Sequence, residues 1–97
     1  MSRSAAFHFR LYVVGDAPHS TQAIANLDAL CRAHLPDRHH IEIVDVLQEP
    51  ARALADKVLL TPTLVKLAPA PKRKIIGNLS ETATLLQVLG LRPAKTA

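Results

Sequence analysis

The chain has 97 residues, of which 48% are hydrophobic, which suits a single globular domain with one core. It contains neither an apolar run of about 18 residues nor the apolar segment of a secretory signal, so we expect a cytoplasmic protein that does not enter a membrane. The formal net charge of +4 favours acidic partners. The aromatic residues Phe7, Phe9 and Tyr12 all fall in one expected strand, which leaves no stacking surface for nucleic acid.

The first half of the chain predicts a strand, a helix and a second strand. Apolar and polar residues alternate over 7–14, which is the period of a half-buried strand. Apolar residues then recur at three- and four-residue spacing up to Leu35, which predicts a helix with Ser20 as its N-cap. Residues 41–47 predict a second strand, more apolar than the first. Because the connection between the strands is a helix, we expect them to be parallel.

The second half predicts a short helix, two strands and a final helix. Pro50 suits the first turn of a helix that ends near Val58. Residues 63–67 form the next expected strand, and residues 72–76 are expected to return beside it as a hairpin. A last helix is expected between Ser80, as N-cap, and Gly90, as the residue that ends it.

This order, βαβαββα, is that of a thioredoxin-like α/β fold. We therefore expect one domain over residues 1–91, followed by a disordered tail over 92–97.

The position of the cysteine argues against dithiol chemistry. Redox thioredoxins place a reactive thiol at the start of the first helix, where the helix N-terminus lowers the pKa of the thiol. Residues 15–20 hold no cysteine, and Cys31, the only one in the chain, falls on the apolar face of the helix about three turns further on. We expect it to be a packing residue. A thiol- or glutathione-dependent enzyme that lacks the paired cysteines remains the alternative.

Other catalytic and metal sites find little support in the sequence. Adjacent histidines such as His39 and His40 point to opposite sides of a strand, and a structural zinc site needs four convergent ligands. We expect no catalytic residue, no metal and no cofactor.

The basic residues of the second half are the remaining candidates for a functional site. Lys72, Arg73 and Lys74 lie on the expected return strand. They can pair with carboxylates of another protein, or they can be the solvated charges that protect an edge strand from aggregation. Both interpretations stay open from composition alone.

Several stretches together resemble the KaiB family of bacterial clock proteins, over about residues 11–89. The most specific is Thr61-Pro62-Thr63-Leu64-Val65-Lys66. Two further matching stretches lie in the first half: residues 11–15, and Pro18 with Ser20, Ala23 and Leu27. The remaining two are residues 43–47 followed by Pro50, and residues 75–80 preceded by Pro69, Pro71 and Arg73.

The resemblance implies a small non-enzymatic protein that binds KaiC, a hexameric ATPase, and regulates its phosphorylation state. A KaiA-like protein or a sensor histidine kinase would be a further partner, and docking on such a kinase is an alternative function. The residues expected to supply complementary charge are Lys57, Lys66, Lys72, Arg73 and Lys74.

The resemblance also implies two folds for one chain. One is the thioredoxin-like monomer that binds KaiC. The other is a ground state of order βαββααβ, often tetrameric, for which a dimer or tetramer is expected here. Slow isomerisation of X-Pro bonds can time such a switch. The positions to suspect are Pro62, Pro69, Pro71, Gly77 and Asn78.

Three departures from the family pattern lie in the second half. Alanines interrupt the prolines of 68–71, Asn78 replaces an aspartate, and Pro93 stands where the ground state needs a strand. We therefore expect this chain to favour the thioredoxin-like state.

Overall fold

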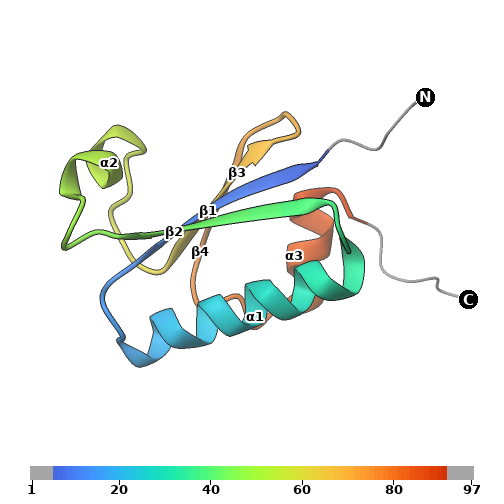
Figure 1. Cartoon of the computed structure of the whole chain (residues 1–97), viewed down its shortest axis with the longest axis horizontal. Helices are drawn as coiled ribbons and strands as arrows, with labels where there is room; N and C mark the ends of the chain where they lie inside the picture. Colours follow the sequence, from blue (N-terminus) through green and yellow to red (C-terminus); the bar gives the residue numbers. More distant parts are fainter. Residues whose placement is uncertain (1–5, 92–97) are drawn as a thin grey trace, which may run out of the picture.

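A computed structural model describes residues 6–91 of the chain, and the expected tail over 92–97 lies outside these residues. The predicted order of elements is confirmed (Figure 1). The elements are β1 (Phe7–Val13), α1 (Pro18–His34), β2 (His39–Asp45), α2 (Pro50–Ala55), β3 (Thr63–Ala68), β4 (Arg73–Ile76) and α3 (Thr82–Leu89).

The four strands form one sheet in the order β2-β1-β3-β4. β1 is parallel to β2, as predicted, and antiparallel to β3, while β3 and β4 form the expected antiparallel hairpin. β1 and β3 are therefore the central strands, and β2 and β4 are the edges. The fold is thioredoxin-like α/β.

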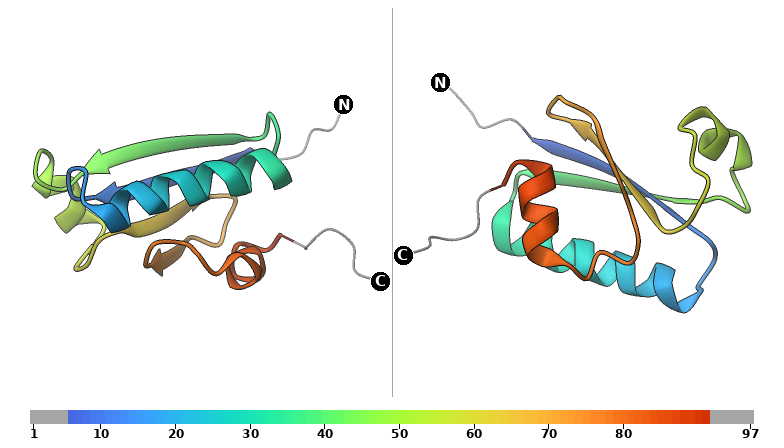
Figure 2. Two further views of the ribbon diagram at one scale, coloured as in Figure 1. Left: turned by 90° about the horizontal axis from the view of Figure 1, so that it is seen from below. Right: turned by 180° about the vertical axis from the view of Figure 1, so that it is seen from behind.

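The two faces of the sheet carry separate clusters of buried side chains. The larger cluster includes Phe9, Leu27 and Leu86, and so joins β1 to α1 and α3. The smaller includes Tyr12, Val65 and Ala53, and joins the other face of the sheet to α2. α2 lies at the end of the sheet away from α3 (Figures 1 and 2). The alternation of β1 explains this division, because successive side chains point to opposite faces.

The predicted N-caps of α1 and α3 are wrong. α1 begins at Pro18, so Ser20 lies inside the helix, where its buried Oγ accepts a hydrogen bond of 3.1 Å from the Val14 amide. Proline is well suited to the first helical position because its fixed φ is helical and it lacks only an N–H that has no partner there. α3 begins at Thr82 after Glu81, and Ser80 lies outside it.

β2 also differs from its prediction. It spans His39–Asp45, two residues earlier than expected, and it is an edge strand with Ile43 43% exposed. It lies at the edge of the sheet although residues 41–47 were predicted to be a more apolar strand than the first. Of its side chains, only Val44 is fully buried, beneath α2.

Gly90 ends α3 in the left-handed conformation, with φ of 80°. The amides of Gly90 and Leu91 donate to the carbonyls of Gln87 and Leu86, as in a common helix-ending motif. Replacing Gly90 with alanine is expected to lower the free energy of unfolding by about 1 kcal/mol, because a Cβ disfavours this backbone conformation. Among residues 6–91, and apart from the two flanking residues, no atom lies within 4 Å of the added Cβ, so the expected loss comes from the backbone conformation.

Chemical denaturation measures this effect. Gly90→Asn is the matched variant, because asparagine tolerates the left-handed conformation better than alanine. Equal stability of Gly90→Ala and the unchanged chain would contradict the assignment.

Within residues 6–91, no helix has both the length and the apolar character needed to cross a bilayer.

Candidate docking surface

The three prolines predicted to act in a conformational switch lie around β3. The peptide bonds before Pro62, Pro69 and Pro71 are all cis. Pro62 is buried and precedes β3, and its carbonyl accepts a hydrogen bond of 2.9 Å from the amide of Gly77, which follows β4. Pro69 and Pro71 lie in the turn between the two strands.

Gly77 and Asn78 join the end of β4 to α1. Gly77 has a φ of 125°, a backbone conformation that residues other than glycine rarely adopt. The Asn78 carbonyl accepts a hydrogen bond of 2.8 Å from Asn26, and its side-chain amide donates one of 2.9 Å to Gln22. These residues therefore fix the loop before α3 onto the side of α1.

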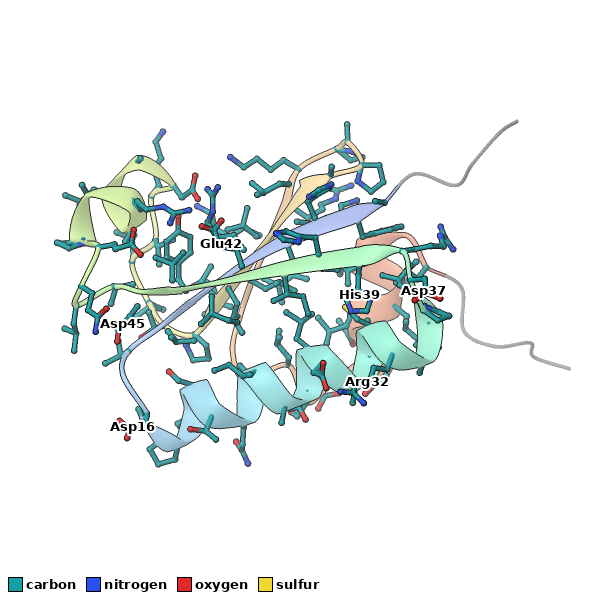
Figure 3. All side chains as sticks on the ribbon, viewed as in Figure 1. Asp16, Arg32, Asp37, His39, Glu42 and Asp45 are labelled. Carbon is teal, nitrogen blue, oxygen red and sulfur yellow. The ribbon has the colours of Figure 1, made fainter. Side chains whose placement is uncertain are left out.

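The start of α1 holds no sulfur, although redox thioredoxins place a reactive thiol there. The turn after β1 is held instead by Asp45, whose carboxylate accepts a hydrogen bond of 3.2 Å from the Gly15 amide. Figure 3 shows Asp16 at the start of α1 and Asp45 at the end of β2. Cys31 is fully buried in the core, as predicted, where burial and then the charge of Asp28 raise the pKa of its thiol to about 12. This thiol stays protonated near neutral pH.

A charged network attaches α2 to the sheet. Arg10 on β1 donates to Glu42 on β2 and to Asp56 after α2, both at 3.0 Å. The Tyr12 hydroxyl donates to the same Asp56 oxygen at 2.5 Å. Arg52 on α2 completes the network with a contact of 2.5 Å to Glu42, which Figure 3 labels on β2.

The network holds its two carboxylates in the ionised form. Hydrogen bonds from Arg52 and then Arg10 lower the pKa of Glu42. Burial acts to raise the pKa of Asp56, but hydrogen bonds from Tyr12 and Arg10 outweigh it, so the pKa of Asp56 is lowered.

The basic triplet of Lys72, which precedes β4, and Arg73 and Lys74, which begin it, divides between the two faces of the sheet. Lys74 lies opposite Val65, on the α2 face, and its Nζ donates to the carbonyls of Asp56 and Lys57 at 2.7 and 3.2 Å. Lys72 lies 3.6 Å from the Asp56 carboxylate. Arg73, between them, lies opposite Lys66 and faces α1 and α3.

An open hollow of about 330 Å³ lies between α2 and β4, and we call it the α2–β4 hollow. Lys57 is exposed at its edge. The lining residues are Ala55, Asp56, Lys57, Val65, Lys72, Arg73 and Lys74. Arg73 borders the hollow from the edge strand, although the register of β4 turns its side chain toward the other face of the sheet. The hollow combines several cations with a single carboxylate, so its charge favours an anionic partner.

Lys66 is set apart from the other predicted partner residues by its burial. Only 4% of the residue is exposed, and its Nζ lies 5.9 Å from the centre of the Phe7 ring. Burial and then the charge of Arg73 lower the pKa of Lys66. Lys66 therefore offers almost no accessible surface to a partner protein. The other residues predicted to bind the partner are exposed: Lys57, Lys72, Arg73 and Lys74.

Comparison with known proteins identifies the family. The KaiB domain matches residues 10–91 of the chain. The chain belongs to the KaiB family. Circadian clock protein KaiB3 of Synechocystis sp. is 44% identical over 84 residues, which cover 87% of this chain and 82% of that protein. The circadian clock oscillator protein KaiB of Synechococcus elongatus is 37% identical over 91 residues, covering 94% and 89%.

Solved structures support the fold of this KaiB-family chain. The N-terminal domain of Synechococcus elongatus SasA superposes with a TM-score of 0.75 at 18% identity, covering 99% of this chain and 94% of that domain. Mitochondrial thioredoxin 3 of Saccharomyces cerevisiae gives a TM-score of 0.71 at 20% identity, covering 91% and 81%. Identities this low support the thioredoxin-like fold alone.

The network that positions α2 in this KaiB-family protein was not predicted from the sequence. Arg10 occupies a polar position in the alternation of β1, so the local pattern carried no signal of its role in the network. Its partner Asp56 is 46 residues away, so their contact depends on the register of the sheet and the return of the chain after α2.

Proposed function

We propose that this protein is a non-enzymatic timing regulator that acts in the cytoplasm, docks on a KaiC-type hexameric ATPase and modulates the phosphorylation state of that ATPase. The observation that carries the proposal is the KaiB-family match over residues 10–91 of a chain with a thioredoxin-like arrangement. The exposed charges of Lys57, Lys72, Arg73 and Lys74 supply the complementary surface for an acidic region of the partner.

The proposal includes an exchange between the thioredoxin-like monomer and a dimeric or tetrameric ground state of order βαββααβ. The suspected switch residues are Pro62, Pro69, Pro71, Gly77 and Asn78. Asn78 supports it by its position, because its hydrogen bonds with Asn26 and Gln22 tie the loop before α3 to α1, at the start of the segment that would rearrange. We expect the thioredoxin-like state to dominate in solution. An NMR secondary-structure map with strand from Leu86 through Leu91 would contradict this.

Co-purification with a KaiC-type ATPase, in the presence and absence of ATP, tests the docking. We expect a stable complex in one nucleotide state and a shift in the phosphorylated fraction of the ATPase. A KaiA-like protein and a sensor histidine kinase serve as further candidate partners in the same experiment. The absence of any complex with the ATPase at micromolar concentrations, with or without ATP, would overturn the proposal.

The alternative, a thiol- or glutathione-dependent enzyme, makes a different prediction about Cys31. Because this thiol is buried and its pKa is raised to about 12, we expect no reduction of insulin disulfides that depends on Cys31. The assay compares the unchanged chain with Cys31→Ser and with a thioredoxin as positive control. Reduction that disappears in Cys31→Ser would favour the enzyme.

A further inference from the structure

Two histidines from neighbouring strands lie side by side on the face of the sheet that carries α2. His8 on β1 and His40 on β2 are direct partners in the parallel register, and they alternate with residues of the other face. The centres of their rings are 5.7 Å apart, and the ring planes meet at 50°. We call these two residues the His8–His40 pair.

The register gives His40 a partner that its neighbour in the sequence does not supply. His39 points to the opposite face, as predicted for adjacent histidines, and its Nδ1 lies 2.8 Å from the Leu35 carbonyl oxygen. Figure 3 shows His39 between β2 and α1. A metal site that is excluded for His39 and His40 is therefore not excluded for His8 and His40.

The His8–His40 pair is open to solvent. α2 packs over the other end of this face, where Tyr12 and Val44 are fully buried. His8 and His40 lie earlier on the same two strands, and both are exposed. Within residues 6–91, neither ring takes part in an ion pair or a side-chain hydrogen bond. An ion in solution therefore has direct access to the pair.

We propose that the His8–His40 pair binds a divalent transition-metal ion, with Cu²⁺ bound most tightly. Imidazole nitrogens suit copper, nickel and zinc, and copper has the highest affinity of this series. An ion about 2.0–2.1 Å from one nitrogen of each ring places the two ring centres roughly 5–6 Å apart. The observed separation of 5.7 Å lies in this range, so rotation of the side chains is enough to bring both rings to one ion.

Water completes the coordination of this ion. The part of the chain that the structure describes contains no group of three or more histidine, cysteine, aspartate or glutamate side chains that could hold a metal. The next side chain of β2 on this face is Glu42, and its two carboxylate oxygens pair with Arg10 and Arg52. Residues 1–5 and 92–97 include none of these four residue types. The site therefore has two protein ligands and open positions, unlike a closed structural zinc site.

Two ligand variants and one matched control test the site. His8→Ala and His40→Ala each remove one imidazole at an exposed position, so we expect both variants to fold. His8→Gln and His40→Gln repeat the test with a side chain closer in size to histidine. His19→Ala is the control, because His19 is also an exposed histidine but lies in the first turn of α1. An NMR spectrum recorded without metal checks the fold of each variant.

The experiment titrates the isotope-labelled chain with CuCl₂ in a buffer that does not bind metals. Calorimetry measures the affinity, and two-dimensional NMR follows the broadening of amide signals by the paramagnetic ion. We expect one Cu²⁺ per chain, with the first broadening at residues 7–9 and 39–41. Each ligand variant should bind at least about tenfold more weakly, because the second imidazole of a chelating pair acts at a high effective concentration. His19→Ala should bind as the unchanged chain does. ZnCl₂ should bind at the same residues more weakly.

Two results would overturn the site. One is the absence of saturable binding with a stoichiometry of one ion per chain. The other is a loss of affinity in His19→Ala that equals the loss in His8→Ala and His40→Ala, because that pattern indicates independent binding to single histidines. The ATPase takes no part in the experiment, so its outcome is independent of the proposed docking.

Discussion

Replacing Asp56 with alanine is expected to lower the free energy of unfolding by about 2–4 kcal/mol. The Asp56 side chain is only 11% exposed, and it accepts hydrogen bonds from Arg10 and Tyr12. Its removal leaves the Arg10 guanidinium with one carboxylate in place of two and takes one partner from the Tyr12 hydroxyl. Chemical denaturation at neutral pH measures the loss.

Asp28→Ala is the matched control for this variant. Asp28 also pairs with an arginine, at 2.9 Å, but its side chain is 50% exposed and the pair lies on the surface of α1. Such pairs contribute less than about 1 kcal/mol. If Asp56→Ala is no less stable than Asp28→Ala, the network does not hold α2 in the way described.

The lowered pKa of Asp56 makes the stability of the folded chain depend on pH. A carboxylate whose pKa is lower in the folded than in the unfolded chain contributes stability above the unfolded pKa, about 3.9 for aspartate. That contribution is lost as the pH falls through the folded-state pKa. We expect the unchanged chain to lose more stability than Asp56→Ala between neutral pH and the acid side of pH 4. Parallel stability curves for the two proteins would contradict this.

Charge reversal of Arg73 is expected to weaken docking on the ATPase at least about tenfold at low ionic strength. Arg73 is exposed, and it makes no ion pair or side-chain hydrogen bond within residues 6–91, so Arg73→Glu changes charge without breaking a described contact. Lys74→Glu is a less specific test, because Lys74 also binds the carbonyls that follow α2. Binding affinity measured against salt concentration gives the result.

Arg32→Glu provides the same change of charge on α1, where the Arg32 side chain is 76% exposed. We expect it to weaken docking less than Arg73→Glu. An unchanged affinity of Arg73→Glu at low salt would remove Arg73 from the docking surface, and equal losses in both variants would indicate long-range attraction without a local contact.

The order of the helices and strands could be predicted because it follows from patterns among neighbouring residues. The period of β1 and the three- and four-residue spacing in α1 depend only on neighbouring residues. The predicted helix starts were less accurate, because Ser20 and Ser80 are plausible caps when only neighbouring residues are considered. In the structure α1 begins two residues before Ser20, at Pro18, and the N-cap of α3 is Glu81, one residue after Ser80.

The faces of the sheet on which the basic residues lie could not be predicted from local sequence patterns. Lys72, Arg73 and Lys74 form one group in the sequence, but the register of β4 on β3 sends Arg73 to one face and its neighbours to the other. The burial of Lys66 likewise follows from its place on the central strand β3, opposite Phe9 of β1. Such facts require the pairing of strands that are distant in sequence. The roles of these residues in docking and switching stay predictions.

The position of β1 makes the domain hard to divide. One edge of the strand pairs with β2 from the first half, and the other pairs with β3 from the second half. Arg10 repeats this division in its side chain, with one contact to each half. A fragment that ends after β2 would therefore expose an unpaired backbone edge and release a charge from its partner. β1 thus couples the two halves, together with the packing of α3 against α1, so loss of order in either half destabilises the other.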